Sequence, residues 1–151
     1  MSTPQQAAPI SLRITRSFAA PRAKVFQAWT DPKAFAKWMA PSAEFQTRIP
    51  KFELRVGGSY RLEMQLGDKN NVVEGTYREI RPPEKLVFTW RWATPSTGGD
   101  AGDTLVTLEF SERGGQTELV LTHEGFLTTE ARDAHDHGWI GCLDRLQKYV
   151  A

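Results

Sequence analysis

The sequence predicts an α+β fold in which a curved antiparallel sheet of about six or seven strands wraps around one long C-terminal helix. Two observations predict this fold. From residue 44 to residue 123, short segments alternate apolar and polar residues between turns rich in Gly, Pro and Asn, which is typical of strands. Residues 128–151 instead repeat apolar residues at every third or fourth position, which is typical of an amphipathic helix. Such a helix needs an apolar surface, and the sheet would provide it.

The first strand and two short helices are expected before the main run of strands. Residues 10–18 alternate apolar and polar side chains, which predicts a half-buried strand. Pro21 suits the first turn of a helix, where a missing N–H has no cost. Asp31 is a good N-cap and Pro32 a good first residue for a second short helix, which would bury Trp38.

The remaining strands are separated by clear turn signals. We expect them at residues 44–49, 51–56, 59–66, 72–80, 85–92, 104–110 and 117–123. Residues 93–102 are expected to form a flexible polar loop. Two strands alternate strictly, so that Tyr60 and Met64 share one face of the first, and Phe88, Trp90 and Trp92 share one face of the second. Because the strands form a meander, the sheet should twist and present a concave apolar face.

The final helix has an unusual apolar face. Thr128 is the expected N-cap, and the buried stripe contains His135, Trp139 and Cys142. Gly138 and Gly141 lie beside Trp139, although each glycine costs a helix interior about 1 kcal/mol relative to alanine. These glycines predict that the helix stands back from the sheet at this point.

Composition restricts the classes of partner. The chain has 151 residues and a formal net charge of +1, which predicts one domain at residues 10–151 after a polar tail at residues 1–9, and disfavours nucleic acid as a partner. We expect no membrane span and no signal peptide, because no long apolar run occurs. The single cysteine, Cys142, suits a reducing compartment, so we expect a cytoplasmic location.

Several motifs in this order resemble the SRPBCC superfamily, which has the START-like or helix-grip fold. Within it, the chain is most similar to the activator of heat-shock protein 90 ATPase homologue 1-like group. The resemblance covers residues 10–150 and is carried by Ala20–Pro21, residues 25–32, Trp38, residues 57–61, residues 75–90 (GTYREIRPPEKLVFTW), residues 117–126 (TELVLTHEGF) and Gly138–Trp139. It implies a deep cavity between sheet and helix. Members of the superfamily include lipid carriers, hormone receptors and polyketide aromatases and cyclases.

We therefore expect the chain to bind a small hydrophobic or aromatic molecule, such as a lipid or a polyketide, between the sheet and the C-terminal helix. Tyr60, His135 and the Trp139 N–H would orient the ligand. The alternative is that the aromatic side chains fill the core solidly, as single buried aromatics usually do. The expected ligand-binding residues are Trp38, Tyr60, Met64, Phe88, Trp90, Trp92, His135, Trp139 and Cys142.

No catalytic residue, metal site or cofactor is expected. His135 and His137 lie two apart on a helix and point to different sides, so they cannot share one metal ion. Cys142 is about 10 Å along the helix from His135, too far for a nucleophile and its base. His123 ends a strand beside Glu124 and is expected to hold the turn. Two alternatives stay open: a cyclase or hydrolase with His135 as acid or base, and a co-chaperone-like module for a heat-shock protein 90 homologue. The sequence also leaves room for a homodimer.

Overall fold

The computed structural model describes residues 10–93 and 103–151. The expected polar tail at residues 1–9, and the expected loop at residues 93–102 except for Ala93, lie outside the described residues. Within the described ranges, no helix is both long enough and apolar enough to cross a membrane.

The described chain forms one seven-stranded antiparallel sheet and three helices. The elements are β1 Ile10–Phe18, α1 Arg22–Thr30, α2 Pro32–Trp38, β2 Gln46–Phe52, β3 Ser59–Leu66, β4 Lys69–Arg81, β5 Lys85–Trp92, β6 Thr104–Arg113, β7 Gln116–Phe126 and α3 Thr129–Val150. The order across the sheet is β1-β7-β6-β5-β4-β3-β2, so the first strand joins the last one and the others follow as a meander. This is the predicted α+β helix-grip fold, and the prediction is confirmed.

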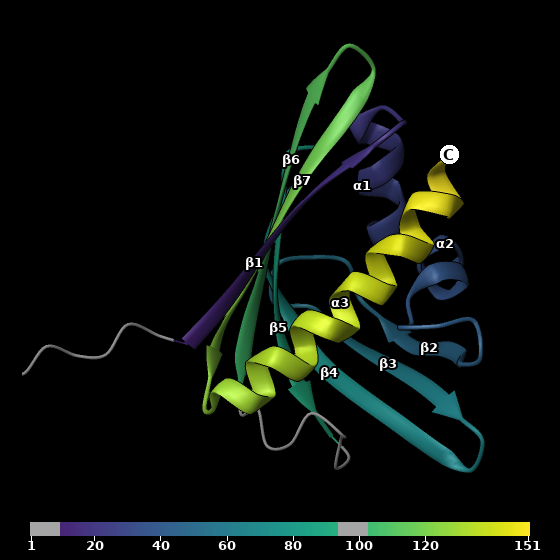
Figure 1. Cartoon of the computed structure of the whole chain (residues 1–151), viewed down its shortest axis with the longest axis vertical. Coiled ribbons are helices and arrows are strands. Elements are labelled where there is room, and N and C mark those ends of the chain that lie inside the picture. Colours follow the sequence, from purple (N-terminus) through teal and green to yellow (C-terminus); the bar gives the residue numbers. More distant parts are fainter. Residues whose placement is uncertain (1–9, 94–102) are drawn as a thin grey trace, which may run out of the picture.

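Helix α3 runs diagonally across one face of the curved sheet, with α1 and α2 beyond the half that leads to the C-terminus (Figure 1). The expected cap is present, because the Thr128 hydroxyl accepts a hydrogen bond of 3.1 Å from the Ala131 N–H. Asp31 likewise caps α2 by accepting from the Lys33 N–H, and Pro32 is the first helical residue. Local sequence signals therefore set the start of both helices.

The sheet differs from the expectation at one edge. Residues 44–49 and 51–56 are expected as two strands, but residues 46–52 form the single strand β2, and residues 53–56 lie outside any strand. The register of β2 with β3 shifts between Arg48 and Lys51. Pro50 lies inside this irregularity. Since proline has no N–H to donate, it is tolerated in an edge strand at a bulge, so it bends β2 without ending it.

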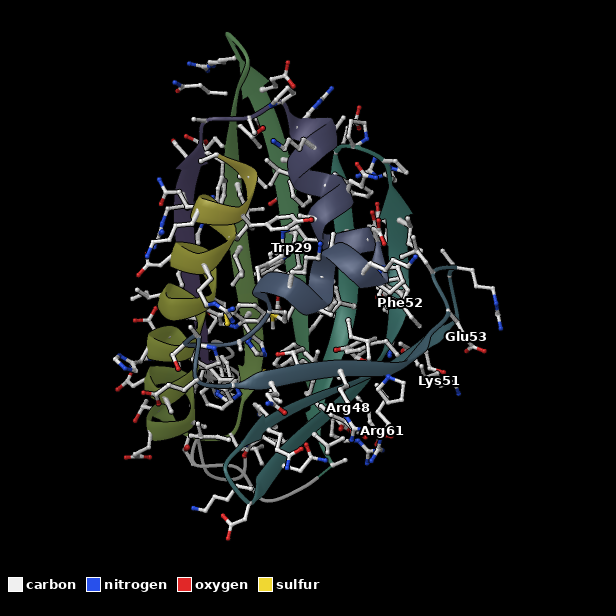
Figure 2. All side chains as sticks on the ribbon, turned by 90° about the vertical axis from the view of Figure 1, so that its right-hand side faces the viewer. Trp29, Arg48, Lys51, Phe52, Glu53 and Arg61 are labelled. Carbon is white, nitrogen blue, oxygen red and sulfur yellow. The ribbon has the colours of Figure 1, made fainter. Side chains whose placement is uncertain are left out.

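The core is centred on Trp29, which is 1% exposed and lies between the helices and the sheet (Figure 2). Its ring centroid is 4.7 Å from that of Trp38, 6.0 Å from that of Trp139 and 6.4 Å from that of Phe88. One aromatic cluster thus joins α1, α2, α3 and β5. The C-terminal half of α3 fills this core with aliphatic side chains such as Leu143 and Leu146. Its N-terminal half instead borders a cavity, which is the candidate site.

Candidate functional site

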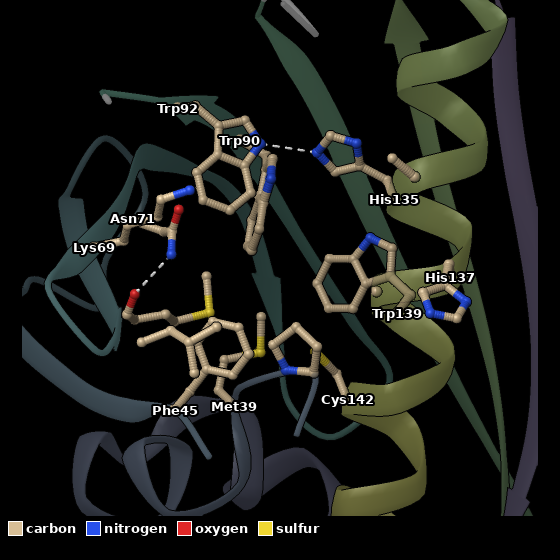
Figure 3. A pocket seen from close by; sticks show the side chains of 15 residues that line it. Met39, Phe45, Lys69, Asn71, Trp90, Trp92, His135, His137, Trp139 and Cys142 are labelled. Atoms are coloured by element: carbon tan, nitrogen blue, oxygen red, sulfur yellow. Dashed lines mark hydrogen bonds between the residues drawn. The ribbon is translucent and has the colours of Figure 1, made fainter. Parts of the chain in front are cut away.

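A cavity of about 340 Å³ lies between the N-terminal half of α3 and the sheet. It has three walls (Figure 3). Helix α3 contributes a face from Ala134 to Cys142, and β5 contributes Trp90 and Trp92. The third wall combines the β3–β4 hairpin (Met64, Leu66, Lys69, Asn71) with the segment after α2 (Met39, Pro41, Phe45). The volume is at the lower end of the range typical of small-molecule sites.

Three tryptophan rings form the inner surface of this cavity. The centroids of Trp90 and Trp139 are 5.1 Å apart with an interplanar angle of 49°, so strand β5 and helix α3 meet ring against ring. Trp92 stands edge-on to Trp90, at 5.8 Å and 89°. Met39 and Met64 approach from the third wall, and their flexible thioethers can adapt to guests of different shape. The surface is suited to an apolar or aromatic guest.

The two helix glycines have different environments. A Cβ added at Gly138 would meet no atom within 4 Å, and Gly138 lines the cavity. A Cβ added at Gly141 would collide with the carbonyl oxygen of Pro41. Helix α3 therefore stands back at Gly138, as the sequence predicted, but at Gly141 it touches the segment after α2.

His135 lines the cavity as a neutral ring with both nitrogens in use. Its Nε2 accepts a hydrogen bond of 2.8 Å from the Trp92 indole N–H. Its Nδ1 is 2.7 Å from the Ala131 carbonyl oxygen and must donate to it, since a carbonyl oxygen only accepts. Burial lowers the pKa of His135, because it disfavours the charged ring, although the bond to Ala131 acts in the opposite direction.

Behind the cavity, His123 holds Trp139 in place. The Trp139 indole N–H donates to His123 Nδ1 at 3.0 Å, and His123 Nε2 lies 2.6 Å from the Thr104 hydroxyl. That hydroxyl donates to the Trp90 carbonyl oxygen at 2.7 Å, so it must accept from His123. The chain of bonds requires a neutral His123. Burial, and secondarily the nearby His135, lower its pKa well below the usual value.

Sequence reasoning missed this role of His123, which it assigned only to the strand end. The signal was present in the alternation of β7, where Thr117, Leu119, Leu121 and His123 are all buried on one face. What the alternation did not show is the partner. Trp139 comes from α3 and Thr104 from β6, and only the packing of α3 brings them together.

Three expected site residues do not line the cavity. Tyr60 lies across Gly75, close enough that a Cβ there would meet its ring, and its hydroxyl donates to the Thr89 carbonyl oxygen at 2.6 Å. Phe88 packs in the core against Tyr60, at 5.8 Å. Trp38 is 1% exposed beside Trp29, and its N–H donates to the Ala28 carbonyl oxygen. The other six expected residues do line it: Met64, Trp90, Trp92, His135, Trp139 and Cys142.

Cys142 and Trp90 bring little reactive chemistry to the cavity. Burial raises the pKa of the Cys142 thiol to about 12, so the thiolate needed for nucleophilic attack is scarce near neutral pH. The Trp90 indole nitrogen is buried and has no hydrogen-bond partner among the described residues. Within residues 10–93 and 103–151, no group of three His, Cys, Asp or Glu side chains is arranged to hold a metal ion.

Polar side chains gather at one side of the cavity, and sequence reasoning did not select them. Lys69 and Asn71 lie on the wall opposite Trp139 and His137 (Figure 3). The Asn71 amide N–H donates to the Met64 carbonyl oxygen at 3.2 Å. Lys69 and Asn71 alternate with Val73 on β4, so the period-two pattern places all three on the inner face. Lys69 was not among the expected site residues because the strand was expected to begin at residue 72.

A second hollow, of about 370 Å³, lies on the other face of the sheet around Arg61, Glu74 and Arg91. Its charges are largely paired. Arg61 lies 2.9 Å from Glu74, while Arg91 lies 3.9 Å from Glu74 and 3.6 Å from Asp103. Such a network is typical of a solvated outer face, where each pair contributes little. We therefore take the apolar cavity as the candidate functional site.

Comparison with known proteins agrees with this architecture. The family model described as Activator of Hsp90 ATPase homolog 1-like protein matches residues 19–151. A search of curated proteins found no match.

Solved structures similar to this chain come from several bacteria. A crystal structure of protein CV1439 from Chromobacterium violaceum has 27% identity and a TM-score of 0.83, and the match covers 93% of this chain and 96% of that one. A solution structure of a Staphylococcus epidermidis protein has 23% identity and a TM-score of 0.79, covering 98% and 93%. CalU16 from Micromonospora echinospora has 24% identity and a TM-score of 0.68, covering 95% and 77%. The last two likenesses show the fold alone.

Proposed function

The chain belongs to the Activator of Hsp90 ATPase homolog 1-like family, and from that premise we propose that it binds a small apolar or aromatic molecule in the cavity between the sheet and α3. The observation that carries this proposal is the space in front of Gly138. A helix residue that faces the sheet normally packs against it, yet a Cβ at this position would meet nothing within 4 Å. Around this space stand the rings of Trp90, Trp92 and Trp139.

The site supports binding better than acid–base catalysis. A general base needs a free lone pair within reach of the substrate, whereas the lone pair of His135 Nε2 already accepts from Trp92. The Nδ1 proton of His135 is likewise engaged with Ala131. His135 therefore acts in this proposal as a fixed part of the wall, which keeps Trp92 turned toward α3.

The co-chaperone alternative rests on the family description, whereas ligand binding rests on the cavity as well, so we place ligand binding first. The two make different demands on the chain. A module that acts through its outer surface should keep its activity when the cavity is blocked. A ligand carrier should lose its ligand binding.

Native mass spectrometry of freshly purified protein tests the proposal, with Gly138→Leu as the blocking variant. The leucine should fill the space and abolish both a retained ligand mass and the quenching of tryptophan fluorescence by a panel of lipids and aromatic polyketides. Asp133→Leu is the matched control, because it places the same side chain on an exposed position of α3. Binding that survives Gly138→Leu in a folded protein would show that this cavity is not the site.

A further inference from the structure

We propose that the ligand is an amphipathic carboxylate, whose apolar body lies among the tryptophan rings and whose anionic head binds Lys69. This inference rests on the proposed function and deepens it. The cavity has a single fully charged lining residue among those the structure describes, and that residue is Lys69. No described aspartate or glutamate lines it. A cavity with one cationic end and an apolar interior is complementary to an anion with an apolar body.

The position of Lys69 explains why its ammonium group is available. Lys69 begins β4 and pairs with Leu66 across the β3–β4 hairpin. Within the described ranges it takes part in no ion pair, although most other arginines and lysines of β3 to β5 do. Those side chains interact with neighbouring carboxylates such as Glu74 and Glu79, whereas Lys69 lines the cavity. It is therefore the unpaired cation of this wall.

The inner face of β4 becomes steadily more polar toward this end. Val73 is fully buried, Asn71 is half-buried and Lys69 is exposed, although the alternation of the strand places all three on the same face. A ligand lying along this gradient would place its apolar body near Trp90 and its polar head at the hairpin. A lysine also suits this end physically, since its four-carbon stem can cover apolar surface while the ammonium group stays hydrated.

The opposite wall agrees with this orientation. His137 lies on α3 across the cavity from Lys69 (Figure 3) and is exposed. An imidazole carries at least one N–H donor and a lysine ammonium carries three, so both walls supply donors and, among the described residues, neither supplies a carboxylate. A cationic head group in the same place would meet a like charge, and the described lining offers it no carboxylate. The direction of charge selectivity follows.

Isothermal titration calorimetry with three matched probes tests this inference. Phenylbutyric acid, phenylbutanol and phenylbutylamine share one apolar body and differ in head group. At low ionic strength, where screening is weak, the acid should bind about twofold to fivefold more tightly than the alcohol, and the amine most weakly. Lys69→Gln should bring the acid to the affinity of the alcohol, and Lys69→Glu should make the amine preferred over the acid.

Lys148→Gln is the control, because Lys148 is an exposed lysine on α3 that does not line the cavity. It should leave the order of affinities unchanged. Equal binding of acid and alcohol to the natural protein, or a preference for the acid that survives Lys69→Gln, would overturn the charge inference while ligand binding itself stands. Failure of all three probes to bind would instead count against the proposed function.

Discussion

The two halves of α3 are built for different purposes. In the C-terminal half, Leu143, Leu146 and Val150 are at most 1% exposed and belong to the continuous core. In the N-terminal half, His135, Gly138 and Trp139 face the cavity. The turning point is Gly141, where the backbone of α3 meets that of Pro41.

The C-terminal half is also tied down from outside. Arg16 of β1 forms an ion pair of 2.8 Å with Asp144, and Arg145 donates to the Lys37 carbonyl oxygen of α2 at 3.2 Å. These contacts hold the C-terminal half of α3 against β1 and α2. A helix that is anchored over one half in this way can leave its other half beside a cavity. The packed half supplies stability, and the open half is left free to bind.

The largest expected effect is the loss of a side chain from the packed half. Leu146→Ala should lower the free energy of unfolding by about 2–5 kcal/mol, because it leaves a hole in a fully enclosed site. Met64→Ala, on the cavity wall, should cost clearly less, since one side of Met64 already borders open space. Denaturant unfolding of both variants checks the comparison. Equal losses would show that the two halves are equally well packed.

Lowering the pH should destabilise the protein through the two histidines at the cavity, His123 and His135. His123 and His135 have lowered pKa values in the folded protein, so their contribution is fully present above the ordinary histidine pKa near 6.5 and is lost as the pH falls below it. Stability should fall by up to about 1.4 kcal/mol per pH unit for each histidine that stays neutral when folded.

Chemical unfolding measured between about pH 7 and pH 5 checks this expectation, because most carboxylates ionise below that range. His123→Gln should make the slope shallower by removing one of the two groups. A stability that is level across this range would contradict the neutral hydrogen-bonded chain from Trp139 to Thr104.

The third comparison concerns Gly141. Alanine at this position would force the α3 backbone away from Pro41, and overpacking of this kind costs about 1–3 kcal/mol. The shift should also disturb the neighbouring cavity wall, so ligand-dependent fluorescence should weaken together with the melting temperature. A Gly141→Ala variant as stable as the natural protein would mean that the close contact does not hold α3 in place.

The smallest effect, and one of opposite sign, is expected at Gly138. Alanine should stabilise the helix by up to about 1 kcal/mol, because it lowers the cost of ordering the backbone and meets no atom within 4 Å. The added methyl group would also reduce the space for a guest. The melting temperature measured by thermal unfolding should therefore rise, while the affinity for the ligand falls severalfold. A loss of stability at this position would contradict the open space in front of it.

Much of the fold was predictable because hydrophobic periodicity, turn residues and helix caps are local features of the sequence. The alternation in β3 and β5 placed Met64, Trp90 and Trp92 on inner faces, and the helical period did the same for His135 and Trp139. Capping residues marked the start of α2 and α3. Each of these signals depends only on neighbours a few residues away. The break expected between residues 49 and 51 is absent, because the effect of a proline such as Pro50 depends on whether its strand is central or at an edge.

For the site, the sequence predicted which way the side chains point but not which of them border the cavity. Tyr60, Phe88 and Trp90 all face inward, yet Tyr60 crosses Gly75 to reach Thr89, and only Trp90 borders the cavity. An inward direction does not say how far away the opposite wall stands. That distance depends on where α3 rests, and a position three residues along the helix is enough to change open space at Gly138 into contact at Gly141.

Residue periodicity and the motifs read along the chain were thus enough to predict the order of the elements, the buried face of most of them and the family, but not the single edge strand β2 or the start of β4. The packing of the elements in three dimensions determines which inward faces close on one another and which leave a cavity. It also determines that His123 holds Trp139 and that Lys69 stands at the polar end of that cavity. The physical reason is that packing depends on distances between elements far apart in the chain, and periodicity specifies orientation without specifying distance.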